Sequence, residues 1–467
     1  MECSISIVGM SCRFAGCPSP DALWAAVMAR RSNLAPLPPD LALPAGRKGV
    51  FARPYPSRLG QLGDLYSCVP SMQTFPRQVN AGENQDLYFA TQLAFDALAD
   101  ASMRPRSRTP LEGSVRLGYA PPFNASTMNW LQHTEFLDQT MEVIRRFFPH
   151  APPERLDGVR EKLVESLPVP DASSFLLGTG YRFASWISRE CAFAGVSSIM
   201  DAGMLTGAAT VDAAVCDLVC GNADIALAGA VTPPVSRSYL EGLSGGVQFS
   251  QRPELHPFSA VQDGTIPGEG GAFFVLKRRA DALRDRDRIY ANIRAVAIGR
   301  TVDTETGHVL GKAAEKARVD PTTIGLVEAD GSGIGQSESR EVAALQQIWG
   351  EHRPGRPLVG IGSVKGNIGH TLRAAMAAGM AKAAMALKYR ILPPQVAVEN
   401  PLAALSSASS SVYLLCEARP WVSGDSSRPR RAAVLGSNFD ASERVEASAR
   451  GGRAAAILLE EEPETRE

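Results

Sequence analysis

Apolar and polar positions along this chain alternate between two kinds of segment. Short continuous apolar runs, such as residues 4–10 and 224–231, have the length and composition of buried strands. Longer segments, such as residues 86–101, repeat their apolar side chains every three or four positions, which predicts a helix with one buried face. The alternation of the two kinds of segment predicts an α/β fold with covered sheets.

The same alternation occurs in both halves of the chain. We divide it into an N-terminal half, residues 1–280, a C-terminal half, residues 281–460, and an acidic tail, residues 461–467. Two insertions are expected in the first half, at residues 33–75 and 125–170; the second contains two helices, near 136–148 and 156–167. In the second half we expect helices over 309–318, 337–349 and 372–389, and strands over 324–329, 357–361, 411–416, 431–436 and 455–460.

Composition and charge narrow the function classes. The 467 residues carry 48 Lys and Arg against 49 Asp and Glu, so no net field favours nucleic acid or an anionic membrane as a partner. No apolar segment reaches the roughly 20 residues that cross a bilayer. Residues 374–387 come nearest, but Lys382 interrupts them, and the first residues show no signal-type pattern. We therefore expect a cytoplasmic protein with no membrane span and no nucleic-acid partner.

The cysteines and histidines predict no bound metal. The eight cysteines include no CxxC pair and are expected to be reduced structural thiols, and Cys216 and Cys220 are expected to face the core. The histidines lack metal-ligand spacing, so we predict no metal site, and no cofactor is expected. Residues 242–246 (GLSGG) fit the GxSxG hydrolase pattern, but no apolar strand precedes them, so a nucleophile is not expected there.

The most informative segment begins at Gly195 and reads GVSSIMDAGMLTGAATVDAAVCDLV. It runs from an apolar strand through a turn of small residues into an apolar helix. This layout places one side chain at the positive end of a buried helix, where a nucleophile would be activated. That side chain is Met204, whose thioether has no ionisable proton and cannot form a thioester.

This segment resembles the active-site segment of the ketosynthases of the thiolase superfamily, in which the acyl-accepting cysteine follows DTA. The resemblance covers nearly the whole chain and includes IVGMSCRFAG from Ile7, DIALAGAV from Asp224 and SVKGNIGHT from Ser363. The chain is therefore identified as a degenerate beta-ketoacyl synthase that lacks the nucleophilic cysteine. The resemblance implies a thiolase-like fold, in which two similar βαβαβ halves form a five-layered α-β-α-β-α core with the site at their junction.

In this family a cysteine and two histidines carry the chemistry, and a lysine supports the second histidine. By resemblance, Met204 replaces the cysteine, Asp330 in EADGSGI replaces the first histidine, and the second histidine and the lysine are retained as His370 and Lys365. A carboxylate does not replace a neutral imidazole that donates a hydrogen bond. We therefore expect Asp330 to form an ion pair with Lys365 or His370, and Met204 to act as an apolar plug.

The glycine-rich segment near the end of the chain departs from the family as well. The family's FGFGGTNAHVVLEE aligns with SARGGRAAAILLEE at residues 448–461. Gly451 and Gly452 are kept, whereas Arg450 replaces the aromatic residue that gates the acyl site in active members. The resemblance thus places Arg450, Gly451, Gly452 and Phe258 along a substrate channel.

The resemblance favours a non-elongating subunit, similar to a chain-length factor, in polyketide or fatty-acid-type lipid biosynthesis. Such a subunit pairs with an active ketosynthase and shapes its acyl tunnel; a homodimer is the other pairing expected. An acyl carrier protein with an acyl or malonyl thioester is a further expected partner. Two alternatives stay open. In one, His370, Lys365 and Asp330 decarboxylate malonyl-carrier protein, or transfer an acyl group without a cysteine; in the other, the chain only binds an acyl chain or a carrier protein.

Overall fold

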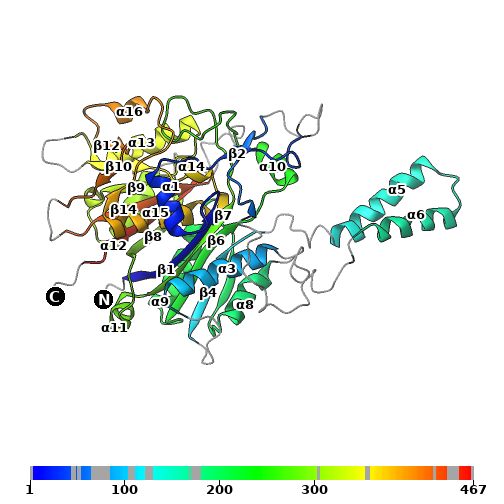
Figure 1. Ribbon diagram of the computed structural model, residues 1–467, viewed down its shortest axis with the longest axis horizontal. Coiled ribbons are helices and arrows are strands. Elements are labelled where there is room, and N and C mark those ends of the chain that lie inside the picture. The colour runs from blue at the N-terminus through cyan, green and yellow to red at the C-terminus, as the bar shows by residue number, and fades with distance from the viewer. Residues whose placement is uncertain are drawn as a thin grey trace.

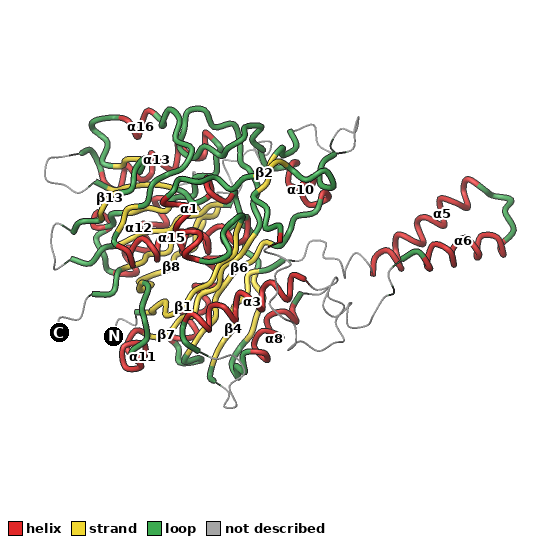
Figure 2. Tube along the Cα trace, in the orientation of Figure 1, coloured by secondary structure: helices red, strands yellow, loops and turns green. Residues whose placement is uncertain are grey.

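The computed structural model describes residues 4–43, 49, 54–64, 85–103, 111–120, 130–167, 169, 180–301, 306–352, 358–423, 428–438 and 452–463. Within these ranges eleven strands form one continuous sheet, in the order β12-β10-β9-β14-β15-β8-β1-β7-β6-β4-β5 (Figures 1 and 2). The strands are β1 (Ile5–Phe14), β4 (Gly113–Gly118), β5 (Ser197–Met200), β6 (Ile225–Thr232), β7 (Gly270–Arg278), β8 (Ala291–Thr301), β9 (Leu326–Glu328), β10 (Val359–Gly362), β12 (Val412–Leu414), β14 (Arg431–Ser437) and β15 (Gly452–Glu460).

The two halves of this sheet repeat one pairing pattern. In the first half β5, β4 and β6 are parallel, and β7 and then β1 follow antiparallel. In the second half β10, β9 and β14 are parallel, and β15 and then β8 follow antiparallel. Three residue pairs between β1 and β8 join the halves. The predicted α/β fold with two similar halves is thus confirmed.

Helices cover both outer faces and fill the space between the halves. Helices α3 (Gln85–Asp100) and α8 (Tyr181–Glu190) pack with β4, β6 and β7 around one apolar core. Helices α12 (Thr306–Ala317) and α13 (Gly335–Trp349) pack with the second half around another. Between them lie α1 (Pro20–Met28), α9 (Thr206–Val219) and α15 (Ala375–Tyr389), in contact with both halves. The result is five alternating layers of helix and sheet.

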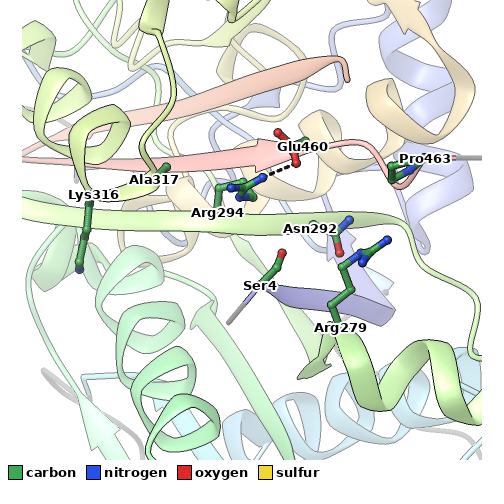
Figure 3. A pocket seen from close by; sticks show the side chains of 8 residues that line it. All are labelled: Ser4, Arg279, Asn292, Arg294, Lys316, Ala317, Glu460 and Pro463. Atoms are coloured by element: carbon green, nitrogen blue, oxygen red, sulfur yellow. Dashed lines mark hydrogen bonds and ion pairs between the residues drawn. The ribbon is translucent and has the colours of Figure 1, made fainter. Parts of the chain in front are cut away.

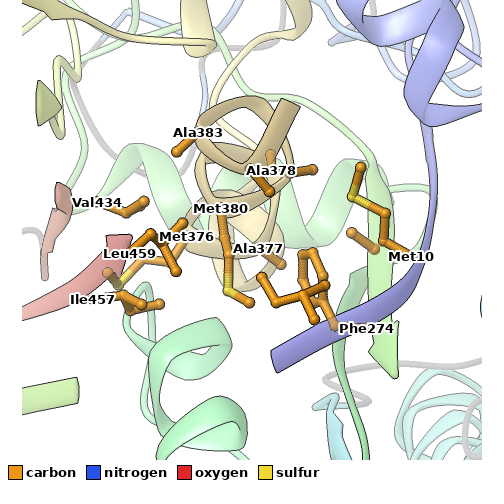
Figure 4. Close-up of a cluster of buried hydrophobic side chains, with 14 of the residues drawn as sticks. Met10, Phe274, Met376, Ala377, Ala378, Met380, Ala383, Val434, Ile457 and Leu459 are labelled. Atoms are coloured by element: carbon orange, nitrogen blue, oxygen red, sulfur yellow. The ribbon is translucent and has the colours of Figure 1, made fainter. Parts of the chain in front are cut away.

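The central helix α15 is buried on every side. All residues from 375 to 387 are buried, which explains why the sequence there is apolar and Ala-rich around the whole helix. Figure 4 shows its methionines among side chains from both halves: Met10, Phe274, Val434, Ile457 and Leu459. The charge of Lys382 is accommodated because its ammonium pairs with the buried Glu328 carboxylate at 2.7 Å.

The remaining elements are short, apart from a helical hairpin that projects from the body (Figure 1). This hairpin comprises a π-helical turn (Gln132–Phe136), α5 (Leu137–Phe147) and α6 (Pro153–Glu165), so the two helices predicted in the second insertion are present. The other elements are α10 (Arg237–Ser244), α11 (Arg279–Asp285), α14 (Lys365–Ile368), α16 (Ala403–Ser406), the 3-10 turns Pro321–Thr323 and Leu372–Ala374, and the strand pairs β2 (Ala35–Pro36) with β3 (Arg58–Leu59) and β11 (Ile391–Leu392) with β13 (Arg419–Pro420).

Two details of the sequence analysis need comment. The prediction that Cys216 and Cys220 face the core is wrong, because α9 buries the face that carries Ala214 and Leu218 and leaves both thiols exposed. The GLSGG segment begins within the last turns of α10. Among the described residues, no helix is long and apolar enough to cross a membrane.

Candidate functional site

Four chain segments meet where the strands of the two halves end. In the second half, Asp330 follows β9, Lys365 and His370 follow β10, and Asn438 follows β14. In the first half, Met204 lies between β5 and α9. Carboxyl ends of neighbouring parallel strands share one edge of a sheet, so the topology brings these side chains toward one region, as open α/β sheets do for their ligands.

Asp330 and Lys365 form a buried ion pair. The Lys365 ammonium lies 2.8 Å from one Asp330 carboxylate oxygen, and both side chains are less than one-tenth exposed. The Ser437 hydroxyl donates to the other oxygen at 2.8 Å. Burial opposes ionisation of Asp330, but the Lys365 charge and these hydrogen bonds outweigh it and lower the pKa of Asp330. The expected ion pair with Lys365 is confirmed.

Two further carboxyl groups, Glu341 and Glu338 of α13, hold the loop that carries Asp330. Glu341 accepts the backbone N–H groups of Asp330 at 2.8 Å and Gly331 at 3.2 Å. Glu338 accepts the N–H of Gly333 at 2.6 Å. Burial is the main cause that raises the pKa of Glu341 to about 7 and that of Glu338 to about 8. The loop is therefore fixed from below before any ligand binds.

His370 is held as a neutral imidazole. Its backbone N–H donates to Ile266 at 2.7 Å and its carbonyl accepts from Gly268 at 2.8 Å, so the main chain around it is fixed. Its Nδ1 accepts the backbone N–H of Leu372 at 3.0 Å, which leaves the ring proton on Nε2. Burial, followed by the nearby Lys365 charge, lowers the pKa of His370 to about 3. This histidine can donate one hydrogen bond but does not carry a charge at neutral pH.

The Met204 turn, residues 201–205, is fixed by its own hydrogen bonds. Thr206 donates its hydroxyl to the Gly203 carbonyl at 2.6 Å and accepts the Ala202 N–H at 2.9 Å. The Asp201 carboxylate pairs with Arg373 at 3.1 Å. Gly203 has φ +64°, and a Cβ there would lie 2.8 Å from Oδ1 of Asn438, so the turn requires glycine at this position.

The side chain of Met204 packs against an apolar cluster. Its buried members come from the first insertion, the α10 region and the segment after His370: Leu59, Val235, Leu240 and Leu372. Met204 itself is half-buried. The packing agrees with the expected plug, because a flexible thioether fills irregular apolar space well.

Reciprocal hydrogen bonds connect the strand ends of one half to the loops of the other. From the second half, Asn438 after β14 accepts the N–H of Met204 at 2.8 Å. From the first half, Thr232 at the end of β6 donates its hydroxyl to the carbonyl of Thr371 at 2.7 Å. Because β14 and β6 hold matching positions in the two halves, each half fixes the loop of its counterpart.

The structure describes only two of the four predicted channel residues, Phe258 and Gly452. Phe258 is fully buried, has φ +60° and would lie 3.0 Å from a Cβ at Gly331, so it packs under the Asp330 loop. Gly452 begins β15, where it pairs with Thr301. Arg450 and Gly451 lie outside the described residues. A channel role for these four positions stays a prediction.

Sequence reasoning missed four polar side chains at the site: Ser437, Asn438, Glu338 and Glu341. Ser437 and Asn438 had a detectable signal, since two polar residues follow the predicted strand 431–436. Glu338 and Glu341 are three residues apart in a helix, a spacing that places them on one face. An acidic pair near a helix start is common on surfaces, so this pattern alone does not predict burial.

A polar pocket of about 470 Å³ lies elsewhere, at the far ends of β8 and β15 (Figure 3). It is lined by Arg279, Asn292, Arg294 and Glu460, among others. Asn292 pairs with Glu460 across the strands, whereas the site lies near the opposite end, where Thr301 pairs with Gly452. Arg294 lies 2.5 Å from Glu460 and Arg279 lies 2.5 Å from Glu462, so both arginines of this pocket already have carboxylate partners.

Family models match most of the chain. The model "Beta-ketoacyl synthase, N-terminal domain" matches residues 2–143 and 165–282, and the model "Beta-ketoacyl synthase, C-terminal domain" matches residues 293–399. The candidate site residues Met204, Asp330, Lys365 and His370 lie within these matches, whereas Asn438 lies beyond them.

Curated relatives are much longer than this chain. A mycocerosic acid synthase-like polyketide synthase of Mycobacterium tuberculosis is 29% identical over 92% of this chain, which spans 19% of that protein. A component of the polyunsaturated fatty acid synthase of Thraustochytrium sp. is 33% identical over 58% of this chain, which spans 10% of that protein. The chain thus spans at most about a fifth of each of these two relatives.

Solved structures share the fold at low sequence identity. A ketosynthase from module 6 of the bacillaene synthase of Bacillus subtilis 168 superposes with a TM-score of 0.74 at 23% identity, covering 98% of this chain and 72% of that one. A chain described as "PfaC Keto synthase-Chain length factor" has a TM-score of 0.75 at 22% identity, covering 100% of this chain and 48% of that one.

Proposed function

Because this chain belongs to the beta-ketoacyl synthase family, we propose that it is a non-elongating, chain-length-factor-like subunit that pairs with an active ketosynthase. One observation carries the proposal: the head of α9 holds a thioether, and the amide N–H beside it is bonded to Asn438. Met204 cannot accept an acyl group, so the acyl chain would reside on a cysteine of the partner. An acyl carrier protein would deliver the malonyl unit to that partner.

The environment of Asp330 supports the same proposal. A position that serves acyl transfer needs a group that donates or shuttles a proton in the transition state. Asp330 is held as a carboxylate by Lys365 and Ser437, and a carboxylate only accepts hydrogen bonds. Its interactions are structural, because they fix the loops after β9, β10 and β14 to one another.

The apolar cluster around Met204 supports the tunnel-shaping part of the proposal. An acyl chain needs an apolar wall, and Met204 together with Leu59, Leu240 and Leu372 supplies one at the junction of the halves. The size of residue 204 would then limit how far a growing chain extends. The solved chain named a keto synthase-chain length factor has a similar fold, which is consistent with such a role.

The first test is to identify the partner. The tagged full-length chain is purified from its native host, and the retained proteins are identified by mass spectrometry, with the tag alone as control. We expect a cysteine-containing ketosynthase at equal stoichiometry. Recovery of a homodimer alone would count against the proposal.

Assays of this chain reconstituted with its ketosynthase partner then test separately whether it shapes the acyl tunnel and whether it catalyses the reaction. Replacing the partner's cysteine with alanine should abolish product, whereas Met204→Ala in this chain should leave the turnover rate within about threefold and lengthen the products. Met204→Trp should shorten them. Loss of turnover in Met204→Ala with unchanged product length would contradict the proposal.

A second candidate function is decarboxylation of malonyl-carrier protein by this chain alone. The observation that favours it is the neutral His370, whose Nε2–H can donate to a developing enolate. Carbon dioxide release is measured for the wild type, His370→Ala and the matched control His256→Ala, which removes another buried histidine. Release that only His370→Ala abolishes would establish this second function.

A further inference from the structure

Arg373 joins two separate chain segments beside the candidate site. It lies in the 3-10 turn Leu372–Ala374. Its Nε and one terminal nitrogen donate to the two carboxylate oxygens of Asp201, at 3.1 and 3.3 Å. Its other terminal nitrogen donates to the Tyr239 hydroxyl of α10 at 3.0 Å. One guanidinium therefore connects the Met204 turn to α10.

The Asp201 end of this connection belongs to the hydrogen bonds of the Met204 turn. The Asp201 oxygen that accepts from Nε of Arg373 also accepts the N–H of Gly203 at 3.0 Å, and it lies 3.4 Å from the Thr206 hydroxyl. A planar guanidinium that meets both oxygens of a carboxylate fixes its orientation as well as its distance. The turn thus supplies a fixed base from which Arg373 reaches α10.

The Tyr239 end belongs to the apolar cluster around Met204. Tyr239, Leu240 and Leu243 of α10 all pack in that cluster, and their spacings of three and four residues place them on one face of the helix. Leu240 is fully buried, and the other two are partly buried. Because α10 has only eight residues, its position depends on its contacts more than on its own hydrogen bonds. Whatever holds α10 therefore holds this side of the cluster.

The first insertion holds α10 as well. The Tyr55 hydroxyl donates to the carbonyl of Arg237, the first residue of α10, at 3.5 Å, and the Arg237 guanidinium donates to the carbonyl of Asp40. Figure 1 shows β2 of this insertion near α10. These contacts hold the first turn of α10 from the insertion. The bond from Arg373 to Tyr239 adds a connection to the Met204 turn.

The backbone next to Arg373 has an unusual conformation. Leu372 has φ +48°, a left-handed value that is unfavourable for a leucine. Its N–H donates to Nδ1 of His370 at 3.0 Å, and its side chain is 2% exposed within the apolar cluster. Such a conformation persists only where the surrounding contacts hold it, and it is found mostly at functional sites. Here it accompanies a backbone that places Leu372 in the cluster and lets Arg373 reach Asp201.

We propose that Arg373 is a positioning residue that helps to set how far an acyl chain extends, because it fixes α10 relative to the Met204 turn. This inference rests on the proposed tunnel function and adds to it a determinant of chain length besides Met204. Nε and both terminal nitrogens of Arg373 already donate within the protein, so the residue acts through α10 and not as a ligand of the chain.

Hydrogen exchange of the full chain tests the positioning without any partner. Arg373→Ala should make the backbone amides of residues 237–244 exchange at least about tenfold faster, because α10 loses its connection to the Met204 turn. Tyr239→Phe keeps the ring in the cluster but removes the bond, and should act in the same direction. The double variant should exchange no faster than Arg373→Ala alone, since both substitutions remove one connection. Arg340→Ala, which changes an exposed arginine of α13, is the matched control and should leave this exchange unchanged.

Product lengths then link the position of α10 to the proposed function. In the pair reconstituted with the ketosynthase partner, Arg373→Ala and Tyr239→Phe should broaden the distribution of product lengths and shift it to longer chains. The turnover rate should stay within about threefold of the wild type, because neither side chain touches the reacting atoms. Mass spectrometry of the released acyl chains measures the distribution. A merely structural role would lower turnover and leave the product lengths unchanged.

The outcomes separate this inference from the proposed function. Unchanged exchange of residues 237–244 in Arg373→Ala would show that Arg373 does not fix α10, and would overturn the inference alone. Faster exchange with unchanged product lengths, while Met204→Trp still shortens the products, would show that α10 does not limit the chain although the tunnel function holds. If neither Arg373→Ala nor Met204→Trp changes the product lengths, the proposed function fails and the inference fails with it.

Discussion

The backbone N–H of Met204 donates to Oδ1 of Asn438 at 2.8 Å, across the junction of the two halves. An amide N–H at the head of a helix can stabilise the oxyanion of an acyl transfer only when it is available to the substrate. Here a side chain of the other half occupies it. Under the proposed function, two features would oppose acyl transfer at this position: a side chain that cannot accept the acyl group, and an amide that is already bonded.

Restoring the thiol should restore acyl loading only in part. Met204→Cys should accept an acyl group from an acyl thioester slowly, because Asn438 still holds the amide N–H. Met204→Cys with Asn438→Ala should load about tenfold to a hundredfold faster, since one oxyanion donor is freed. Intact-protein mass spectrometry over time measures the loading.

Neither cysteine variant should elongate the loaded chain, because Asp330 remains bound to Lys365. Asn438→Ala with Met204 retained is the matched control and should acquire no acyl group. Equal loading rates with and without Asn438 would show that this amide does not assist acyl transfer.

Breaking the buried ion pair of Asp330 and Lys365 should lower the free energy of unfolding more than removing both charges does. Asp330→Asn leaves the Lys365 ammonium buried without a carboxylate and should lower the free energy of unfolding by about 3 kcal/mol. Adding Lys365→Met should recover most of that loss. Chemical denaturation measures the free energies of both variants.

The exposed pair of Glu142 and Arg146 supplies the comparison, since Glu142→Gln should change stability by less than about 1 kcal/mol. If Asp330→Asn and the double variant unfold at the same denaturant concentration, the pair does not stabilise the site.

Stability should fall as the pH rises through neutrality because of Glu338. Its pKa of about 8 in the folded chain lies above its ordinary value, so the folded chain binds this proton more tightly than the unfolded chain. The stabilisation is full below about pH 4.5 and is lost as the pH approaches 8. Glu341, with a pKa of about 7, acts in the same direction.

Glu338→Gln isolates this effect from other titrating groups. Between about pH 5.5 and 7.5 the wild type should lose more free energy of unfolding than the variant does. Glu142→Gln, an exposed carboxyl, should follow the wild type. A wild type that gains stability relative to Glu338→Gln over this range would reverse the predicted sign.

Glu269 should tether the segment that supplies Leu59 to the apolar cluster. Its buried carboxylate accepts the N–H groups of Leu62 and Val235, each at 3.0 Å. Glu269→Ala leaves both N–H groups without this acceptor, at a cost of about 1–3 kcal/mol each. Limited trypsin digestion should then cleave after Arg58 at least about tenfold faster. Glu154→Ala, on the exposed face of α6, should leave that rate unchanged.

The fold could be predicted from the sequence because the apolar patterns that encode its helices and strands are local. The elements that frame the site, such as α13 and β14, lie within a few residues of their predicted bounds, since apolar periodicity encodes them directly. The exposure of Cys216 was not accessible, because an apolar run does not reveal which side of a helix lacks a neighbour.

For the site, the sequence predicted which residues are present but few of their contacts. The resemblance located Met204, Asp330, Lys365 and His370, and simple charge pairing predicted an ion pair of Asp330 with Lys365 or His370, of which the pair with Lys365 is present. The contact of Asn438 with Met204 joins residues 234 positions apart, and no local pattern predicts it. The burial of Glu338 and Glu341 was missed for a similar reason, since it depends on where the Asp330 loop lies above α13.

The placement of α15 between the two halves has a consequence for how the chain unfolds. This helix belongs to the second half but is buried against strands of both, and the sheet runs without a break from one half to the other. A fragment that ends near residue 280 would expose the apolar face that α15 covers. The body should therefore melt in a single cooperative transition, and neither half should persist as a separate folding unit.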